Sequence, residues 1–164
     1  LNIAVLTVSD SRTEADDKSG KVLVDRLTSA GHLLADKQIV IDSVYSIRAI
    51  VSNWIADPDV HAVISTGGTG LTGRDITPEA FKVLYDKEIE GFGEIFRMLS
   101  YDLISTSTIQ SRAVAGIANG TVLFTLPGSP GACKDGWDKV ISQQLDIDHK
   151  PCNLVEIMPR FLEI

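Results

Sequence analysis

Hydrophobic residues form three short runs in the first 65 positions of the chain. The first covers residues 2–8 and contains Ile3, Val5 and Val8 with no charged residue between them. This length and composition predict a strand buried on both faces, as the strands of parallel sheets are. Residues 32–41 predict a second, partly exposed strand, and residues 61–65 predict a third, short and apolar one.

The segments between these runs carry the residue spacing of amphipathic helices. After the first run, Leu23 and Leu27 fall on one helical face, and Gly31 lies where helix ends favour glycine. After the second run, apolar residues recur at intervals of three and four, at Ile47, Ile50, Val51, Trp54 and Ile55. Strands and helices that alternate in this order predict a parallel sheet with right-handed connections and helices on its faces.

The second half of the chain predicts one antiparallel strand in this sheet. Residues 92–103 carry the spacing of another long helix. Two apolar runs, residues 114–118 and 121–126, are separated by Asn119-Gly120, a dipeptide that favours the tight turn of a β-hairpin. Residues 133–141 predict a last helix. The expected fold is therefore α/β, with a mostly parallel sheet and an antiparallel hairpin strand.

Composition and charge limit the number of domains, the location of the protein and the class of ligand. The chain has 164 residues, of which 44% are hydrophobic, so one domain over residues 1–164 is expected. No apolar run reaches the roughly 18 positions that a membrane span needs, and the chain starts with a predicted strand, so a cytoplasmic protein is expected. The net charge is −7 and no basic run could follow a phosphate backbone, which argues against a nucleic-acid partner. A small ligand is expected; an anionic one would have to bind through backbone N–H groups, single Arg or Lys residues, or a divalent cation.

Cysteine and histidine residues give no sign of a metal site or of a nucleophile with its base. Cys133 and Cys152 lack metal-ligand spacing and are expected to be reduced thiols, with core packing favoured over catalysis. His32, His61 and His149 are scattered along the chain, which favours a structural or solvated role for each. The candidate chemistry must come from other residues.

Three polar or glycine-rich segments follow predicted strands. They are residues 9–12, residues 66–70 together with Arg74 and Asp75, and residues 127–129. Ligands of open α/β sheets bind beyond the carboxyl ends of the strands, so these segments form the candidate site. Residues 66–70 place three glycines between a strand and a helix, where backbone N–H groups can converge on an anion. The spacing matches neither the P-loop nor the dinucleotide-binding motif, and the alternative is a turn that needs glycine for steric reasons only.

Asp75 is the candidate metal ligand. A carboxylate beside a phosphate site is repulsive unless a cation lies between the two, so Asp75 is expected to hold Mg²⁺ that bridges to phosphate oxygens. The alternatives for Asp75 are helix capping, for which Thr77 is also a candidate, and an ion pair with Arg74. Arg112 is either a surface charge or a phosphate clamp, and the residues alone leave this open.

Five motifs in this order resemble the MoaB/MogA family of molybdenum-cofactor biosynthesis and the equivalent domains of gephyrin. They are residues 7–12, residues 66–70 with 74–80, and residues 91–94, 111–113 and 126–130. The glycine turn followed by Arg-Asp-Ile-Thr-Pro-Glu is the most specific, and residues 90–121 look most like bacterial MoaB. The resemblance implies a three-layer α/β/α fold that binds molybdopterin and transfers AMP from Mg-ATP to its terminal phosphate, with release of pyrophosphate. A molybdate insertion protein of the MoeA type is the partner that this resemblance implies.

The resemblance also implies roles for individual residues. Asp75 looks like the family's functionally important aspartate after the glycine turn, assigned to Mg²⁺-ATP. The turn would contact phosphate, and the other segments would form the walls of the pocket. The expected substrate-binding residues are Ser9, Asp10, Asp17, Thr66, Gly67, Gly68, Thr69, Gly70, Glu79, Ser111, Arg112, Pro127, Gly128 and Ser129. From the residues alone, Ser9 and Asp10 are also candidate turn formers, and Asp17 or Ser19 is a candidate helix N-cap.

One position departs from the family pattern. Active members carry another aspartate in the turn after the second strand, and alignment on the following helix puts Ser43 there, with Asp42 one residue early. Asp42 is expected to be the second catalytic residue beside Asp75. If Asp42 cannot reach the metal, the alternative is a non-catalytic molybdopterin-binding or scaffold protein of the same pathway.

The helix predicted over residues 92–103 carries more apolar side chains than one sheet face readily covers, among them Ile95, Phe96 and Met98. Exposed apolar area of this kind usually marks an interface. A symmetric homo-oligomer is therefore expected, either a trimer or, as the similarity to MoaB suggests, a hexamer made of two trimers. The alternative is complete burial of this helix within the monomer.

Overall fold

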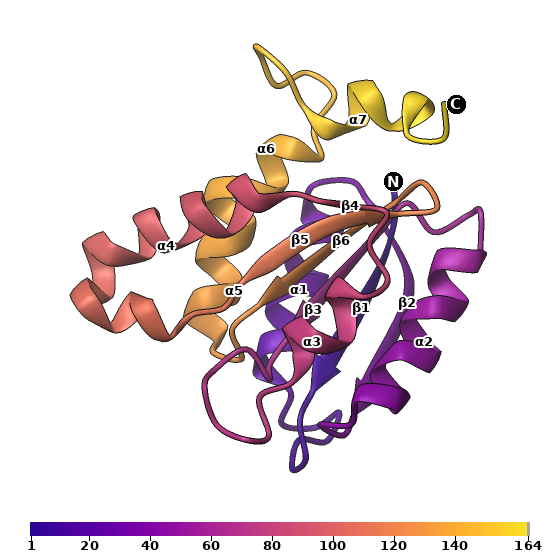
Figure 1. The fold of residues 1–164 in the computed structure, drawn as a ribbon. Coiled ribbons are helices and arrows are strands. Elements are labelled where there is room, and N and C mark those ends of the chain that lie inside the picture. Colours follow the sequence, from indigo (N-terminus) through magenta and orange to yellow (C-terminus); the bar gives the residue numbers. More distant parts are fainter. Residues whose placement is uncertain (164) are drawn as a thin grey trace.

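One mixed sheet of six strands forms the centre of the protein (Figure 1). The computed structural model describes residues 1–163, so Ile164, the last residue of the predicted domain, lies outside the described residues. The strands are β1 (Asn2–Val8), β2 (Leu33–Val40), β3 (Ala62–Thr66), β4 (Lys87–Glu88), β5 (Val114–Ala118) and β6 (Thr121–Leu126). Their order across the sheet is β2-β1-β3-β6-β5-β4. The pairs β2-β1, β1-β3 and β3-β6 are parallel, and β5 is antiparallel to both of its neighbours. The predicted mostly parallel sheet with an antiparallel hairpin strand is confirmed.

Helices cover both faces of the sheet, which gives the three layers that the family resemblance implies (Figure 1). The helices are α1 (Lys18–Ser29), α2 (Val44–Ala56), α3 (Thr77–Lys82), α4 (Glu90–Ile104), α5 (Pro130–Gly136), α6 (Ser142–Gln144) and α7 (Leu154–Ile157). Shorter segments are the 3₁₀ turns η1 (Ser105–Gln110) and η3 (Met158–Arg160) and the π-helical turn η2 (Trp137–Ile141), which joins α5 to α6. Within residues 1–163, no helix has the length and apolar character needed to cross a membrane.

Each central strand supplies side chains to two separate cores. In β1, Ile3 and Val5 pack toward α1, α4 and α5, whereas Ala4 and Leu6 pack toward α2 and α3. All four side chains are completely buried. Successive residues of a strand point to opposite faces, so a strand with helices on both sides must be apolar at every position. This requirement explains why residues 2–8 read as an uninterrupted hydrophobic run.

The hairpin between β5 and β6 closes through the predicted dipeptide. Asn119 and Gly120 have φ angles of +47° and +85°, and Ala118 pairs with Thr121 across the turn. Two successive residues in the left-handed region make the tight turn whose twist matches that of the paired strands, and Asn-Gly tolerates this conformation best. The turn therefore places β5 at the side of β6 and leaves the end of β6 free to face the glycine turn after β3.

Three local features differ from the sequence-based expectation. The edge strand β4 was not predicted, because its two residues, Lys87 and Glu88, are both exposed and carry no apolar alternation. The expectation that Thr77 caps α3 is wrong: Ile76 holds the cap position, and Thr77 begins the helix with its side chain buried. The C-terminal tail, for which no element was predicted, forms α7 and η3.

The long helix α4 is apolar on more than the face it buries. Phe92 and Phe96 pack into the core beside Phe124, whereas Ile95 and Met98 are 46% and 63% exposed. The surplus of apolar side chains expected for this helix is confirmed for Ile95 and Met98, and complete burial of the helix within one chain is excluded. Phe96, expected to be part of that surplus, belongs to the core instead.

Candidate functional site

The three candidate segments meet at one edge of the sheet, at the bottom of Figure 1. Neighbouring parallel strands end there in register, with Thr7 opposite Thr66 and Thr66 opposite Leu126. The loops that follow β1, β3 and β6 therefore leave the sheet side by side. This is the position at which ligands bind in open α/β sheets, as the sequence predicted.

Glycine is required at two positions of the turn after β3. Gly67 has a φ of +101°, and a Cβ there would lie 2.2 Å from the carbonyl oxygen of Val8. Gly68 has a φ of +63°, and its Cβ would lie 2.4 Å from Thr77 Oγ1 and 3.0 Å from Asp42 Oδ1. The steric interpretation of the turn is therefore correct at both positions. It is also compatible with ligand binding, because the missing side chains leave the backbone open to approach.

A cavity of about 380 Å³ lies beside this turn. Its apolar wall comes from α4 and α5, through Phe96, Ile104 and Ala132. Its polar side collects eight of the residues expected at the site: Gly68, Thr69, Gly70, Asp75, Ser111, Pro127, Gly128 and Ser129. A pocket with one apolar wall and convergent backbone N–H groups on the other suits a planar ring system that carries an anionic group.

Asp75 is held against the glycine turn by its own loop. Its Oδ2 accepts hydrogen bonds from the backbone N and the Oγ1 of Thr72, at 2.8 and 2.7 Å. Partial burial acts to raise the pKa of Asp75, but the hydrogen bonds from Thr72 outweigh it, and the pKa lies below the usual value. Asp75 is therefore a carboxylate at neutral pH. It lies so close to Gly70 that a Cβ there would be 2.8 Å from Asp75 Oδ2.

The structure brings Asp42, and not Ser43, to the glycine turn. Asp42 Oδ1 reaches to within 3.0 Å of the Cβ position of Gly68. Ser43 caps α2, because its Oγ accepts a hydrogen bond from the backbone N of Ser46. Burial, and next the negative charge of Asp10, raise the pKa of Asp42. Asp42 therefore reaches the glycine turn, although it lies one residue before the position that the family pattern gives.

Arg74 pairs with Asp10 and not with Asp75, which was the alternative considered for it. Its Nε donates to Asp10 Oδ2 at 2.9 Å, and its NH2 donates to Asp10 Oδ1 at 2.7 Å. The hydrogen bonds from Arg74 lower the pKa of Asp10, and a hydrogen bond from the backbone N of Asp42 adds to the effect. The carboxylates of Asp10, Asp42 and Asp75 therefore gather around the glycine turn from three different loops.

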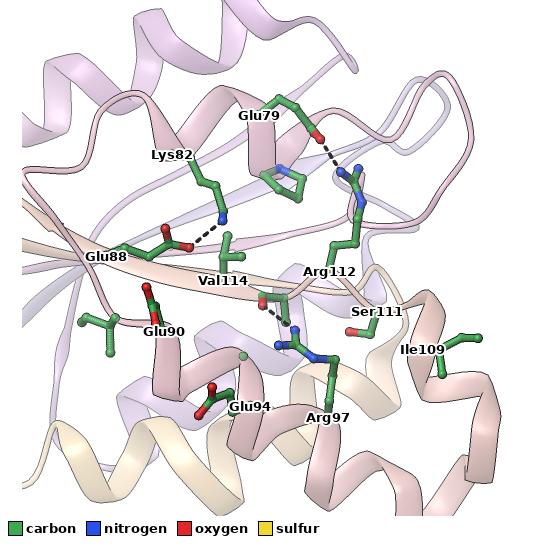
Figure 2. Close-up of a pocket in the computed structure, with 14 residues that line it drawn as sticks. Glu79, Lys82, Glu88, Glu90, Glu94, Arg97, Ile109, Ser111, Arg112 and Val114 are labelled. Carbon is green, nitrogen blue, oxygen red and sulfur yellow. Dashed lines mark hydrogen bonds and ion pairs between the residues drawn. The ribbon is translucent and has the colours of Figure 1, made fainter.

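Arg112 holds the glycine turn in place through contacts of its guanidinium group. Its Nε donates to the carbonyl oxygen of Gly70 at 2.7 Å, its NH2 donates to that of Asp75 at 2.6 Å, and its NH1 pairs with Glu79 (Figure 2). All three guanidinium nitrogens are used in this way, so Arg112 is neither a free surface charge nor a free phosphate clamp in this state. Partial burial acts to raise the pKa of Glu79, but the hydrogen bonds from Arg112 and from the backbone, together with the positive charges of Arg112 and Lys82, lower it overall.

A larger pocket of about 610 Å³ lies on the outer side of Arg112, between α3 and the start of α4 (Figure 2). Glu90, Glu94 and Arg97 line it, together with the paired side chains of Lys82 and Glu88. It contains no residue of the glycine turn. The smaller cavity is the candidate site, because it alone joins the glycine turn to the ends of β3 and β6.

The expectation that Asp17 lines the pocket does not hold in this structure. Its carboxylate is completely buried, accepts hydrogen bonds from Thr7 Oγ1 and the backbone N of Gly20, and lies 3.2 Å from Lys37 Nζ. Asp17 is the N-cap of α1, which was the alternative. Thr66 is likewise buried, and its Oγ1 donates to the carbonyl oxygen of Pro127. Both side chains therefore lie in the interior under the site and stabilise the loops that form it.

Ser9 shapes the first loop, and Arg12 connects that loop to another. Ser9 Oγ accepts hydrogen bonds from the backbone N atoms of Ser11 and Arg12, so Ser9 forms a turn as its alternative role proposed. Arg12, which was not among the expected site residues, donates to Ser19 Oγ and to the carbonyl oxygen of Gly128. Its position in the candidate segment after the first strand, and in the first motif, was the signal in the sequence that could have identified it. Arg12 joins the loop after β1 to the loop after β6.

Cys133 lies beneath the site and is chemically inert there. Its Sγ donates to Thr66 Oγ1 at 3.1 Å. Burial raises the pKa of the Cys133 thiol to about 11, so the thiolate is scarce at neutral pH. The expected packing role of Cys133 is confirmed, whereas Cys152 is a free and exposed thiol.

The described residues offer a metal ion only part of its ligands. No group of three or more His, Cys, Asp or Glu residues within positions 1–163 is arranged to hold a metal. Asp42 and Asp75 nevertheless flank the glycine turn, and Mg²⁺ typically binds through one or two carboxylates, substrate phosphates and water. The donor set therefore fits a magnesium ion that completes its coordination with phosphate oxygens or water.

Comparison with known proteins identifies the family to which this architecture belongs. Residues 4–147 match the family described as the probable molybdopterin binding domain. The chain belongs to this family. The resemblance to MoaB/MogA proteins that the five motifs indicated is thereby confirmed, and so is membership in molybdenum-cofactor biosynthesis.

Similar proteins cover nearly the whole chain. The molybdenum cofactor biosynthesis protein B of Escherichia coli (strain K12) is 56% identical over 151 residues, which are 92% of this chain and 89% of that protein. A crystal structure of a molybdenum cofactor biosynthesis protein B superposes with a TM-score of 0.88 at 40% identity, covering 98% of this chain and 94% of that one. The tungsten cofactor synthesizing protein MoaB from Pyrococcus furiosus superposes with a TM-score of 0.79 at 38% identity, over 87% of this chain and 91% of that one.

We predict that Gly68→Ala destabilises this MoaB/MogA-type fold whereas Gly73→Ala does not. The first change adds a Cβ at a positive φ, 2.4 Å from Thr77 Oγ1, and should lower the free energy of unfolding by about 1–3 kcal/mol. A Cβ at Gly73, in the same loop, meets nothing within 4 Å. Chemical denaturation of both variants measures the difference. Equal stability of the two variants would show that the turn can relax around a side chain.

A second prediction concerns Asp42. Its pKa is raised above the ordinary value of 3.8, so the folded state binds the proton more tightly than the unfolded chain, and this contribution to stability is lost as the pH rises through that region. Asp42→Asn should therefore increase the free energy of unfolding relative to the unsubstituted protein, more at neutral than at acidic pH. Denaturation in the presence of a chelator, at a series of pH values, tests this. A difference that is independent of pH would contradict it.

Proposed function

We propose that this protein is a molybdopterin adenylyltransferase, which transfers AMP from Mg-ATP to the terminal phosphate of molybdopterin. One observation carries the proposal: a glycine turn flanked by Asp42 and Asp75 borders a cavity whose opposite wall is apolar. This combination suits two substrates that each join a planar ring system to phosphate. Membership in the molybdopterin-binding family supports molybdopterin as one of them.

The proposed reaction needs no protein nucleophile. A terminal phosphate oxygen of molybdopterin attacks the α-phosphorus of ATP, and a new phosphorus–oxygen bond forms. The bond from the α-phosphorus to the oxygen that bridges to the β-phosphorus breaks, and its electron pair leaves with pyrophosphate. The attacking oxygen is already anionic, so the protein has to position two phosphates and reduce their repulsion. This accounts for a site without a Ser-His or Cys-His pair and for the inert Cys133.

Different residues of the site position the phosphates and reduce their repulsion. Backbone N–H groups of the glycine turn bind phosphate oxygens, and Arg112 keeps the turn in place through Gly70 and Asp75. Asp42 and Asp75 would hold Mg²⁺, which supplies the positive charge that neutralises the triphosphate. The charged state of Asp75 suits this role. Phe96 and Ile104 offer the apolar surface on which a ring can lie.

A second candidate function is a binding protein without catalysis. It would hold molybdopterin, or the adenylylated product, for a molybdate insertion protein of the MoeA type. The position of Asp42, one residue before that of the aspartate in active members, favours this alternative. The two functions share the cavity and differ in whether AMP is transferred.

The experiment is to incubate the purified protein with molybdopterin, Mg²⁺ and ATP labelled at the α-phosphate. We predict labelled molybdopterin and released pyrophosphate, and a loss of about 100-fold or more in rate for Asp75→Asn, which removes charge but keeps an oxygen to accept from Thr72. Asp59→Asn, at the opposite end of the sheet, is the matched control. Tight binding of molybdopterin without product would select the binding protein. Full activity of Asp75→Asn would remove Asp75 from the metal site.

We also propose that the protein is a symmetric homo-oligomer, a trimer or a hexamer, with α4 in the interface. Ile95, Met98 and Leu103 are 46%, 63% and 59% exposed, and a stripe of this kind is unfavourable in water. Light scattering over a concentration series should give a trimer or hexamer mass. Ile95→Glu with Met98→Glu should reduce that mass, and Val83→Glu, at a residue 64% exposed beyond α3, should leave it unchanged. A monomer at every concentration would contradict the proposal.

A further inference from the structure

Arg74 links two loops beside the glycine turn through one exposed ion pair. Its loop lies between β3 and α3, and Asp10 lies in the loop after β1. The pair is bidentate, and the side chains of Arg74 and Asp10 are 64% and 45% exposed. Exposed pairs of this kind contribute little to stability, since water and salt screen them. The pair can therefore open at little cost.

The surroundings of this pair have an excess of negative charge. Asp10 and Asp75 both act to raise the pKa of Asp42, and Arg74 is the cation that opposes them. In the ligand-free protein, Arg74 thus serves as the counter-ion of a three-carboxylate cluster. It also occupies both oxygens of Asp10.

A buried hydroxyl without a hydrogen-bond partner lies beside this cluster. Thr77 is completely buried, and within the described residues its Oγ1 finds no hydrogen-bond partner. Thr77 Oγ1 and Asp42 Oδ1 both converge on the Cβ position of Gly68, at 2.4 and 3.0 Å. Buried hydroxyls are almost always hydrogen-bonded, so an unpartnered one at the edge of a site indicates a place for a ligand or water.

We infer that Arg74 is an exchangeable counter-ion: it neutralises Asp10 in the free protein and moves to phosphate oxygens when a metal-bound nucleoside triphosphate enters. The inference rests on the proposed function. A divalent cation near Asp42 and Asp75 replaces the charge that Arg74 supplies and repels its guanidinium. The planar fork that fits the two oxygens of Asp10 fits two phosphate oxygens equally well.

This role predicts a different result from the alternative, in which Arg74 only holds the two loops together. As a counter-ion of Asp10, Arg74 opposes binding of a metal ion alone, because its positive charge repels a cation held nearby by Asp42 and Asp75. As a phosphate ligand, it favours binding of the metal–nucleotide complex. Removal of Arg74 should therefore change these two affinities in opposite directions. If Arg74 only held the two loops together, its removal would weaken both.

The test measures two affinities for Arg74→Gln, without turnover. Binding of Mn²⁺ alone, followed by electron paramagnetic resonance, should tighten by about three- to tenfold, as the loss of one nearby positive charge implies. Binding of Mg²⁺ with an ATP analogue that has a methylene group between the α- and β-phosphorus, followed by calorimetry, should weaken by about tenfold. Arg74→Lys should restore the Mn²⁺ affinity of the unsubstituted protein and only part of the nucleotide affinity, because it keeps the charge and loses the fork.

A matched control exists on the surface. Arg160 forms the same bidentate, exposed pair with Glu163, and Arg160→Gln should change neither affinity. If Arg74→Gln weakens both affinities, Arg74 only holds the loops together; if it changes neither, the pair has no role in binding. Either result overturns the inference while the unsubstituted protein still binds Mn²⁺ and the analogue. An unsubstituted protein that binds neither would overturn the proposed function, and the inference with it.

Discussion

The close approach of three strand ends is the constraint on which the rest of the site depends. Gly67 donates its backbone N–H to the carbonyl oxygen of Leu126, and its Cα faces the carbonyl oxygen of Val8 so closely that a side chain would collide with it. A Cβ on Gly128 would lie 3.3 Å from the Cα of Gly67. The loops after β1, β3 and β6 can therefore leave the sheet together only because glycine occupies the contacts between them. The same turn lines the cavity through Gly68, Thr69 and Gly70, where backbone groups can serve an acidic protein in binding an anion.

Two arginines keep this arrangement in place by binding backbone carbonyl oxygens. Arg12 reaches the carbonyl oxygen of Gly128, and Arg112 reaches those of Gly70 and Asp75. Glycine-rich loops lose much conformational entropy on folding, and such charge-assisted hydrogen bonds help to offset that cost. Arg74 differs from both, since it binds a side chain and is largely exposed. The site thus combines two arginines that bind backbone carbonyl oxygens with one that is held by an exposed ion pair.

The carboxylates beside the glycine turn are placed in a way that suits a ligand site but lowers the stability of the free protein. Asp42 is kept near Asp10 and Asp75 although burial and their charges disfavour its ionised form. Thr77 buries a hydroxyl that has no partner within residues 1–163. Both features are unfavourable in the free protein, and both lie beside the glycine turn. Local unfavourable interactions of this kind are typical of sites that are completed by a ligand.

The sequence by itself determined the order of the elements, because that information is local. The run from Asn2 to Val8, the Asn119-Gly120 turn and the spacing of α2 each depend on near neighbours, and each was predicted correctly. The edge strand β4 was not, since its pairing with β5 is a long-range contact between exposed residues. Motif order was enough to indicate the family, because the motifs lie at the ends of strands and helices, which the sequence also predicts.

Only the tertiary structure decided which polar residues face the cavity and which support it. Asp17 and Asp75 look alike in the sequence, as acidic residues in loops before a helix, yet the first is a buried cap and the second borders the cavity. Asp42 lies one residue from its expected position and still reaches the glycine turn. The partner of Arg74 is 64 residues away along the chain. The direction of a side chain and the identity of its partner depend on how distant loops pack, which residue spacing along the chain does not encode.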